Sequence, residues 1–574
     1  MKGEGIYMEL MKRFVYPLAQ KKMVDEVEDF QAKTGLSRLE SAILVNRGVS
    51  LNEVDELMGL SIDDLIDPRL MKDAVKAADV IVSAIDNHEK IVLYSDYDCD
   101  GWGAAVVGYN MIQDMGGDVE IFTNVRSMGY GISKEGVDMV MAKWPTTKVI
   151  LTADNGIVAF DAIDYANGLG LKTVVTDHHQ PAANGQIPNA LAVVNPHRAD
   201  DSYPYENLCG AAVLWKVLSI CYYKKGIPFK RANSYLDIVA TSTVADVVEL
   251  RGENRIIVYH GLKMVSNNCR VQWKIFKDVF SDFNKIETVD TRTVGFSFGP
   301  AINSVSRMTG DIMPAIEAFM TSDEDKIRNI VVSLKNYNKE RKILTEDFTN
   351  AAMMEAELQA DMPICIINNE EFFDGVVGLV AGRVREAINK PTLVFTKEGD
   401  IWKGSGRSIP DYHIKEALDE IQAEYGIMVA YGGHSQACGV SVTDENIIDF
   451  RMAMMEHADQ IPMEAFIKNV VIDYEADVSE IDAHFHDRIK NLEPFGNGFE
   501  EPMIGVVDFV PKEVKFIGSE GQHLVLKGDN FDVVSWYGAK VVEDGIPASF
   551  TVCGRLEKDN FGIKLMVEPE NIQF

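Results

Sequence analysis

The sequence is poor in cysteine, has no long apolar run and has a deficit of positive charge. Its seven cysteines include no CxxC pair, which argues against a zinc ribbon or a disulfide framework and indicates reduced thiols. No apolar run approaches the roughly 20 residues that cross a bilayer. The first residues, MKGEGIYMELMKRF, lack the apolar stretch of a signal peptide, so we expect a cytoplasmic protein without a membrane partner.

Positively charged residues are outnumbered. The 56 lysines and arginines against 88 aspartates and glutamates give a formal net charge of −32. Nonspecific nucleic-acid binders are more often basic, so this balance argues against that class. Net charge describes the whole surface and not one groove, however. A chain of this composition that bound nucleic acid would need metal ions and a local arginine cluster to overcome the background field.

The 574 residues are enough for three or four domains, and the spacing of apolar residues divides them. Residues 1–85, which include MKRFVYPLAQ, have the spacing of helices and are expected to pack on the domain that follows. Residues 86–320 begin with short apolar runs that alternate with helical patterns, which is typical of a parallel α/β sheet. We expect a connecting helix over 321–360, a second α/β unit over 361–467 and a small β-barrel of the OB-fold type over 468–574. The predicted fold class is α/β and multidomain.

Acidic residues and histidines follow three of the predicted strands and one apolar helix. The segments KIVLYSDYDCDG, KVILTADNG, KTVVTDHHQ and LDIVATSTVAD contribute Asp96, Asp98, Asp100, Asp154, Asp177, His178, His179 and Asp246. Open α/β sheets bind ligands at the carboxyl ends of their strands, which meet at one edge. A single aspartate after a strand is more often a helix cap or a turn residue. Four such segments together favour one shared site.

Carboxylates crowded at one sheet edge repel one another, and a metal ion can offset that repulsion. Carboxylate-rich sites with one or two imidazoles suit Mn²⁺ or Mg²⁺ better than zinc. Two such ions that share a carboxylate form the arrangement that hydrolyses phosphate esters. We therefore predict a site for two Mn²⁺ or Mg²⁺ ions.

The segments DYDCDG, TADNG, TDHH and STVADVV, in this order, resemble the four motifs of the DHH phosphoesterase superfamily. The resemblance implies metal ligation by Asp98, Asp100, Asp154, His178 and Asp246, with Asp96 as a further ligand or a hydrogen-bonded neighbour. It also implies that His179 contacts the scissile phosphate or orients a neighbour, and His179 and Asp177 are the predicted catalytic residues. Cys99 and Asn155 depart from the residues common in the family, at positions that bind no metal there.

Segments outside these motifs are similar to the RecJ single-strand exonuclease family. In the first half of the chain they are LVNRGV, DPRLMKDA, GENRIIVYHGL and FGPAINSVSRM. Farther on, DGVVGLVAGRVRE, KGSGRS and YGGHSQACGVSV resemble the DHH-associated domain, and LEPFGNGFEEP resembles the start of the family's OB-fold domain. The resemblance implies a metal-dependent exonuclease that hydrolyses single-stranded DNA from 5′ to 3′ in repair, recombination or replication. It would act as a monomer, with single-strand-binding or repair proteins as partners.

Several residues are predicted to bind the DNA strand. By resemblance, Arg126 joins Ser405 and Arg407 in a pocket for the 5′ phosphate, which a hydroxyl and a guanidinium two residues apart would suit. The glycines of YGGHSQACG let backbone N–H groups approach an anion, and His434 adds a donor. The remaining candidates are Tyr130, Asn303, Arg307 and Arg383, for which structural roles are the alternative.

Three aromatic residues of the expected barrel have two interpretations. Phe516, Trp536 and Tyr537 are candidate surfaces on which bases stack. Aromatic residues of a small β-barrel more often fill its core, so core positions are the stronger expectation for each of them.

Two other functions fit parts of the sequence. A DHH phosphodiesterase that acts on short RNA oligomers or cyclic dinucleotides would share the metal motifs, but it would not need the connecting helix or the barrel. An inactive DHH scaffold that binds replication proteins would not need intact ligand positions in all four motifs. The length of the chain and the complete ligand set favour the exonuclease.

Overall fold

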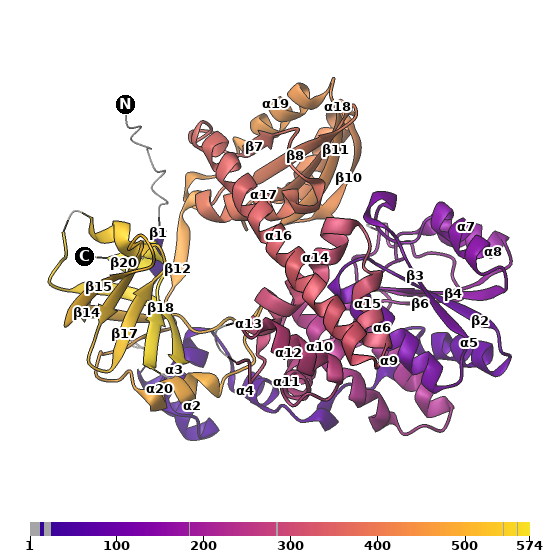
Figure 1. Ribbon diagram of the computed structural model, residues 1–574, viewed down its shortest axis with the longest axis horizontal. Helices are drawn as coiled ribbons and strands as arrows, with labels where there is room; N and C mark the ends of the chain where they lie inside the picture. Colours follow the sequence, from indigo (N-terminus) through magenta and orange to yellow (C-terminus); the bar gives the residue numbers. More distant parts are fainter. Residues whose placement is uncertain are drawn as a thin grey trace. The chain divides into compact units, whose positions relative to one another are not determined.

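The computed structural model describes residues 12–15, 24–182, 184–282, 285–543, 545–559 and 561–573. It divides into two compact units. The larger unit comprises Tyr16–Lys335 and Ile472–Phe574, and the smaller unit comprises Met1–Val15 and Asn336–Val471 (Figure 1). Within the described ranges, no helix is long and apolar enough to span a membrane.

The larger unit begins with helices, as the residue spacing predicts. They are α2 (Val24–Thr34), α3 (Arg38–Asn46), α4 (Leu51–Met58) and α5 (Ala74–Asp86), with the short turns η1 (Ile62–Asp64) and η2 (Pro68–Leu70) before α5. Ser37 begins α3 with a capping box, because its hydroxyl accepts from the Glu40 amide while the Glu40 carboxylate accepts from the Ser37 amide. The apolar faces of α2, α3 and α4 share one core with the C-terminal sheet.

A five-stranded parallel sheet follows, in the order β3-β2-β4-β5-β6. Its strands are β2 (Lys90–Ser95), β3 (Val119–Thr123), β4 (Thr147–Ala153), β5 (Lys172–Thr176) and β6 (Ala192–Val194). Helices cover both faces: α5, α6 (Cys99–Asp114) and α9 (Gly210–Lys224) on one, α7 (Lys134–Lys143) and α8 (Phe160–Gly168) on the other (Figure 1). Burial on both faces explains the continuous apolar runs of β2 and β4. The predicted parallel sheet is confirmed, and the C-terminal ends of β2, β4 and β5 are neighbours.

Further helices complete this half of the unit. They are α10 (Leu236–Ala245), α11 (Gly252–Ser266), α12 (Val271–Phe280), α13 (Thr291–Thr293), the π-helix η5 (Val294–Phe298), α14 (Gly299–Thr309) and α15 (Met313–Met320). The Ser242 hydroxyl of α10 donates to the carbonyl of Cys99 at 3.2 Å. This contact fixes the C-terminal end of α10 beside the start of α6.

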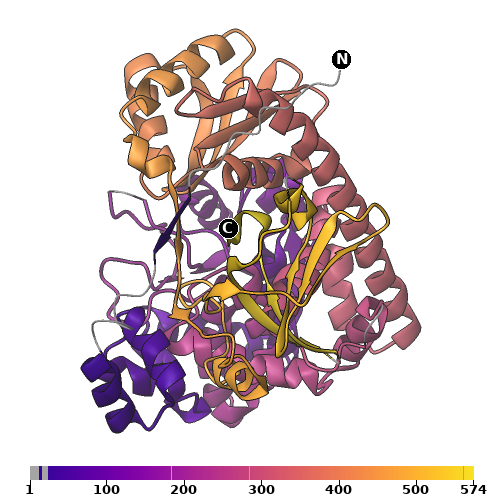
Figure 2. The same ribbon diagram turned by 90° about the vertical axis from the view of Figure 1, so that its left-hand side faces the viewer.

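The C-terminal part of the larger unit is a second sheet, drawn in yellow in Figure 2. Its strands pair in the order β13-β14-β18-β19-β17-β16-β15, with β20 on β18. They are β13 (Tyr474–Glu475), β14 (Ile504–Phe509), β15 (Glu513–Ile517), β16 (His523–Lys527), β17 (Phe531–Ser535), β18 (Phe550–Asp559), β19 (Gly562–Met566) and β20 (Ile572–Gln573). No pairing among the described residues joins the two ends of this path, so hydrogen bonds do not close a full barrel. The expected core positions of Phe516, Trp536 and Tyr537 are wrong, because all three side chains are exposed.

A buried arginine fastens the C-terminal sheet to the rest of the unit. Arg255 of α11 is completely buried and donates to three backbone carbonyls: Leu57 at 2.8 Å, Leu492 at 2.6 Å and Pro494 at 2.6 Å. Its guanidinium also lies 4.6 Å from the centre of the Phe499 ring. One side chain therefore joins α4, α11 and the segment that leads into the C-terminal sheet.

The smaller unit contains a mixed five-stranded sheet in the order β10-β11-β9-β8-β7. Its strands are β7 (Cys365–Asn368), β8 (Thr392–Glu398), β9 (Ile401–Arg407), β10 (Met428–His434) and β11 (Ala437–Thr443). Its helices are α17 (Asp374–Ile388), α18 (Ile414–Tyr425), α19 (Ile447–Ala458) and the part of α16 (Glu324–Glu357) that follows Lys335. This is the second α/β unit that the sequence predicts.

Local structure differs from expectation at one place in the smaller unit. Lys12–Val15 lies in MKRFVYPLAQ, where a helix was expected, but it is strand β1. Pairing with a distant strand determines the conformation of this segment, because β1 runs parallel to β12 (Lys468–Val471) and its backbone forms hydrogen bonds with that strand. The rest of MKRFVYPLAQ lies outside the described residues. The segment YGGHSQACG is a hairpin between β10 and β11, in which Gly432 pairs with Gly439.

Candidate metal centre

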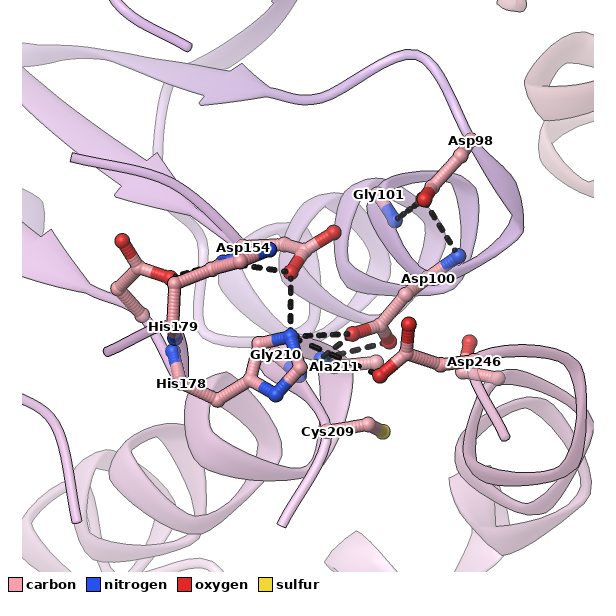
Figure 3. Close-up of polar contacts among 12 residues, drawn as sticks. Asp98, Asp100, Gly101, Asp154, His178, His179, Cys209, Gly210, Ala211 and Asp246 are labelled. Atoms are coloured by element: carbon pink, nitrogen blue, oxygen red, sulfur yellow. Dashed lines mark hydrogen bonds and ion pairs between the residues drawn. The ribbon is translucent and has the colours of Figure 1, made fainter. Parts of the chain in front are cut away.

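The strand ends of the parallel sheet bring the predicted ligands together. Asp96 follows β2, Asp154 follows β4, and His178 lies just after β5. Asp246 ends α10 as its C-cap residue. Figure 3 shows the side chains of Asp154, His178 and Asp246 turned toward one another.

Three overlapping sets of side chains have ligand atoms within 4.8 Å of one another. The sets are Asp96, Asp98 and Asp154; Asp100, His178 and Asp246; and Asp154, His178 and His179. His178 Nε2 lies 3.2 Å from an Asp154 oxygen, 3.6 Å from Asp246 and 3.7 Å from Asp100. Asp154 belongs to two sets, which is the arrangement of a carboxylate shared by two ions.

The start of α6 directs the side chains of Asp98 and Asp100 to different ligand sets. Asp98 is the N-cap, and its Oδ1 accepts from the amides of Asp100 at 2.9 Å and Gly101 at 3.0 Å. Asp100 lies in the first helical turn, and its carboxylate accepts from the amides of Gly210 at 2.5 Å and Ala211 at 3.0 Å. Asp96 and Asp98 therefore share one ligand set, whereas the helix turns Asp100 toward His178 and Asp246.

Gly210 is a site residue that sequence reasoning missed. A Cβ on this residue would lie 2.5 Å from the Cβ of Asp154, so only glycine lets the N-terminus of α9 approach so closely. The amide of Gly210 also holds Asp100 in place. The glycine in LCGAA could have indicated a close approach of the backbone, but Asp154, the residue that it approaches, lies more than fifty residues away in the sequence.

The charges of this cluster are unfavourable without a cation. Burial first, and then neighbouring carboxylates, raise the pKa of Asp154 well above its ordinary value. Burial likewise raises the pKa values of Asp96, Asp100 and Asp246. Three buried atoms have no hydrogen-bond partner among the described residues: Asp96 Oδ1, Asp154 Oδ1 and His178 Nε2. Converging hard oxygen atoms and one imidazole, left without donors, fit divalent cations such as Mn²⁺ or Mg²⁺.

The two adjacent histidines have opposite electrostatic environments. Burial lowers the pKa of His178, which favours the neutral imidazole that can bind a metal. Burial also acts to lower the pKa of His179, but the hydrogen bond and charge of Asp177 outweigh it and raise this pKa to about 9. The His179 Nδ1 lies 2.8 Å from Asp177 Oδ1.

Backbone amides and the His179 ring hold the carboxylate of Asp177. Its carboxylate accepts from the amides of Ile157 at 2.8 Å, His178 at 2.7 Å and His179 at 3.1 Å. It belongs to none of the three ligand sets among the described residues. This position lets Asp177 orient the His179 ring. Tyr130 also orients that ring, because the Tyr130 hydroxyl lies 2.9 Å from His179 Nδ1.

The protonation of this cluster predicts how stability depends on pH without metal. His179 keeps its proton up to about pH 9 in the folded chain but releases it near its ordinary value of 6.5 when unfolded. The folded chain thus binds more protons, so its free energy of unfolding falls as the pH rises through this window, and the raised carboxyl pKa values act in the same direction. We expect the melting temperature in EDTA to fall more steeply from pH 6.5 to 9 for the wild type than for His179→Gln. Equal slopes in calorimetry would contradict the Asp177–His179 pair.

Other predicted contacts of the larger unit lie around α14. Arg126 begins η3 (Arg126–Met128), and its amide donates to the carbonyl of Gly310, just past α14, at 2.9 Å. Its guanidinium lies 5.0 Å from the centre of the Tyr97 ring, and its buried Nε has no hydrogen-bond partner among the described residues. Asn303 and Arg307 lie on α14, and Asn303 Oδ1 is also buried without a partner within the described ranges.

Four predicted contacts belong to the smaller unit. Ser405 and Arg407 lie on β9, where alternate residues share a face, and the guanidinium of Arg407 lies 3.3 Å from the Ser405 hydroxyl. His434 pairs with Ala437, which in turn pairs with Arg407, so the histidine lies at the same level of the sheet. Arg383 lies on α17. The structure thus brings Ser405 and Arg407 together as predicted.

Three regions of the chain match known protein families. Residues 90–243 match the DHH family, N-terminal domain. Residues 361–458 match the DHHA1 domain, and residues 472–568 match the RecJ OB domain. The matches include the parallel sheet and most of the C-terminal sheet of the larger unit, and the five-stranded sheet of the smaller unit.

Proteins of known name are similar to this chain in sequence or in structure. The single-stranded-DNA-specific exonuclease RecJ of Bacillus subtilis (strain 168) is 29% identical over 536 residues, which are 92% of this chain and 66% of that protein. The enzyme of the same name from Dickeya dadantii (strain 3937) is 29% identical over 463 residues, 77% of this chain and 79% of its own. The crystal structure of RecJ in complex with Mn²⁺ from Thermus thermophilus has the same fold, with a TM-score of 0.81 at 23% identity over 99% of this chain and 80% of that one.

Proposed function

Because this chain belongs to the RecJ-like DHH phosphoesterases, we propose that it is a metal-dependent exonuclease that hydrolyses single-stranded DNA from 5′ to 3′. The observation that supports this most is the cluster of buried, unpartnered carboxylate and imidazole atoms at one sheet edge. A complete cluster argues against the inactive scaffold. The OB domain gives the chain a second region for holding a strand, which an enzyme for dinucleotides would not need.

The ligand sets suggest which residues would bind each of two cations. Asp96 and Asp98 would hold one ion, Asp100 and Asp246 with His178 would hold the other, and Asp154 would lie between them. When bound, such ions supply Lewis-acid stabilisation of the attacking and leaving oxygens. His179, held in its protonated form by Asp177, is placed to donate a hydrogen bond to a phosphate oxygen.

The proposed polarity depends on a pocket for the 5′ phosphate that includes Ser405 and Arg407. Burial lowers the pKa of Arg407, and no carboxylate forms an ion pair with its guanidinium among the described residues. A phosphate dianion is the natural partner of such a cation. The setting would be DNA repair, recombination or replication in the cytoplasm, by a monomer that meets single-strand-binding or repair proteins. The seven free thiols agree with a reducing compartment.

The decisive experiment is digestion of end-labelled single strands, with and without a 5′ phosphate, across a series of divalent metals. We expect the wild type to prefer the phosphorylated end. Arg407→Ala should lower kcat/KM for phosphorylated strands about 10- to 100-fold, the value of a charge-assisted hydrogen bond, and change kcat/KM for 5′-hydroxyl strands much less. Lys415→Ala, which removes a cation of the same unit that pairs with Asp419, is the control. An equal loss on both substrates would contradict a 5′-phosphate pocket at Arg407.

A further inference from the structure

A large cavity lies where the C-terminal sheet meets the DHH half of the larger unit. Its volume is about 700 Å³, and we call it the seam cavity; its walls include Val244, Val247, Phe296, Asn497, Trp536 and Arg555. Hydrogen bonds fix the seam: the Leu250 amide donates to the Asn497 carbonyl at 2.8 Å, and the Asn497 side chain donates to the Val247 carbonyl at 2.8 Å. The cavity is thus a fixed feature of one unit.

Two aromatic side chains border this cavity while remaining open to solvent. Phe296 is 72% exposed on the π-helix η5, and Trp536 is 52% exposed just after β17. Val247, in the left-handed region with a φ of 60°, is 63% exposed on the same wall. Exposed apolar side chains gathered around a cavity mark a binding surface, and π-helical turns occur frequently at functional sites.

The charges on the walls argue against a phosphate in the cavity. Two arginines, Arg292 and Arg555, face three glutamates, Glu500, Glu501 and Glu568. Arg292 already pairs with Glu557 of β18. Mostly apolar walls with a few polar groups suit an uncharged flat ring whose edge offers donors and acceptors, which describes a nucleobase.

The cavity also adjoins the candidate metal centre along the chain. Val244 and Val247 flank Asp246, which lies in one of the three ligand sets. We infer that the seam cavity takes one nucleobase of the bound strand, on the 3′ side of the scissile phosphate, with Phe296 and Trp536 as its stacking surfaces. This inference rests on the proposed function, and it adds a base-binding site at a fixed position to the proposed phosphate contacts.

Abasic substitution tests this inference directly. A single abasic nucleotide is moved stepwise along a 5′-phosphorylated thymidine oligomer, and kcat/KM for release of the first nucleotide is measured. Because stacking of one base on an aromatic side chain is worth roughly a 10-fold change in affinity, we expect a loss of about that size at one position and much smaller losses beside it. A flat profile would overturn the inference.

Variants of the cavity show whether the effect arises there. Gly295 lines the cavity, and a Cβ on it would meet nothing closer than the Val244 side chain at 3.9 Å, so the side chain of Gly295→Leu begins in open space. Gly295→Leu and Phe296→Ala should each lower kcat/KM for the intact oligomer about 10-fold and flatten the abasic profile. Phe561→Ala removes an aromatic side chain of the same sheet that is 92% exposed and lies outside the cavity, and it should leave the profile unchanged. An unflattened profile in Gly295→Leu would also overturn the inference.

Tryptophan fluorescence separates this inference from the proposed activity. Trp536 is the only tryptophan of the described residues with an exposed side chain, so its emission should be quenched when thymidine oligomers bind in EDTA. The quenching should be absent in Trp536→Phe and reduced in Gly295→Leu. Quenching in a protein that hydrolyses no strand when metal is added would contradict the proposed nuclease activity but support the base site. Hydrolysis with a flat abasic profile would contradict the base site alone.

Discussion

Asp154→Asn is expected to lower the rate of hydrolysis by on the order of 1,000-fold or more, because it removes a charge that two cations would share. Asp154 belongs to two of the three ligand sets, and its Oδ1 has no hydrogen-bond partner among the described residues. Asparagine has the same shape and keeps the close approach of Gly210. Initial rates on a 5′-labelled single strand in Mn²⁺ measure the effect.

The same substitution should not harm folding when metal is absent. Because the pKa of Asp154 is raised, its ionised form is disfavoured in the folded chain, and removal of the charge should raise the melting temperature in EDTA at pH 8. The rise in melting temperature on addition of Mn²⁺ should shrink. Asp161→Asn, on the exposed surface of α8, should behave as wild type in all three measurements. Activity of Asp154→Asn within tenfold of wild type would contradict the assigned centre.

Arg255→Ala is expected to lower the free energy of unfolding by about 3–5 kcal/mol, the usual result of breaking a buried charged network. The loss of Arg255 leaves the carbonyls of Leu57, Leu492 and Pro494 buried without donors and opens a void beside Phe499. Urea unfolding followed by circular dichroism measures the change.

Two further variants test the geometry of this anchor. Arg255→Lys keeps the charge, but one ammonium group cannot reproduce the planar fork that reaches three carbonyls, so most of the loss should remain. Arg231→Ala removes an exposed arginine that lies 3.7 Å from Asp114, and it should change stability by less than about 1 kcal/mol. Wild-type stability in Arg255→Lys would show that charge rather than geometry holds the segment.

Sequence patterns predicted the parts of this protein that local structure determines. Strands β2, β4 and β5 each contain a short apolar run, and their parallel pairing then brings the residues after them to one edge. For this reason the sequence alone predicted that Asp154 and His178 lie close together. The sequence patterns did not show that Asp98 caps α6 or that the helix turns Asp100 toward His178 and Asp246.

Features that depend on distant partners were not predictable. Lys12–Val15 has a helical pattern but becomes a strand, because β12 supplies a pairing edge. Arg255 resembles an ordinary helix-surface arginine until the carbonyls beyond residue 490 surround it. Trp536 was expected in a core, yet the core of the C-terminal sheet is filled by aliphatic residues and phenylalanines.

The short turn from Asp246 to Leu250 belongs to both halves of the larger unit. At one end is a carboxylate of the candidate metal centre, and at the other the Leu250 amide is bound to Asn497. A fragment that stops before residue 472 would lose the hydrogen bond between the Leu250 amide and Asn497, four residues from that carboxylate, together with the OB domain. The position of Asp246 would then depend on α10, which the Ser242 hydroxyl holds against the carbonyl of Cys99 at the start of α6.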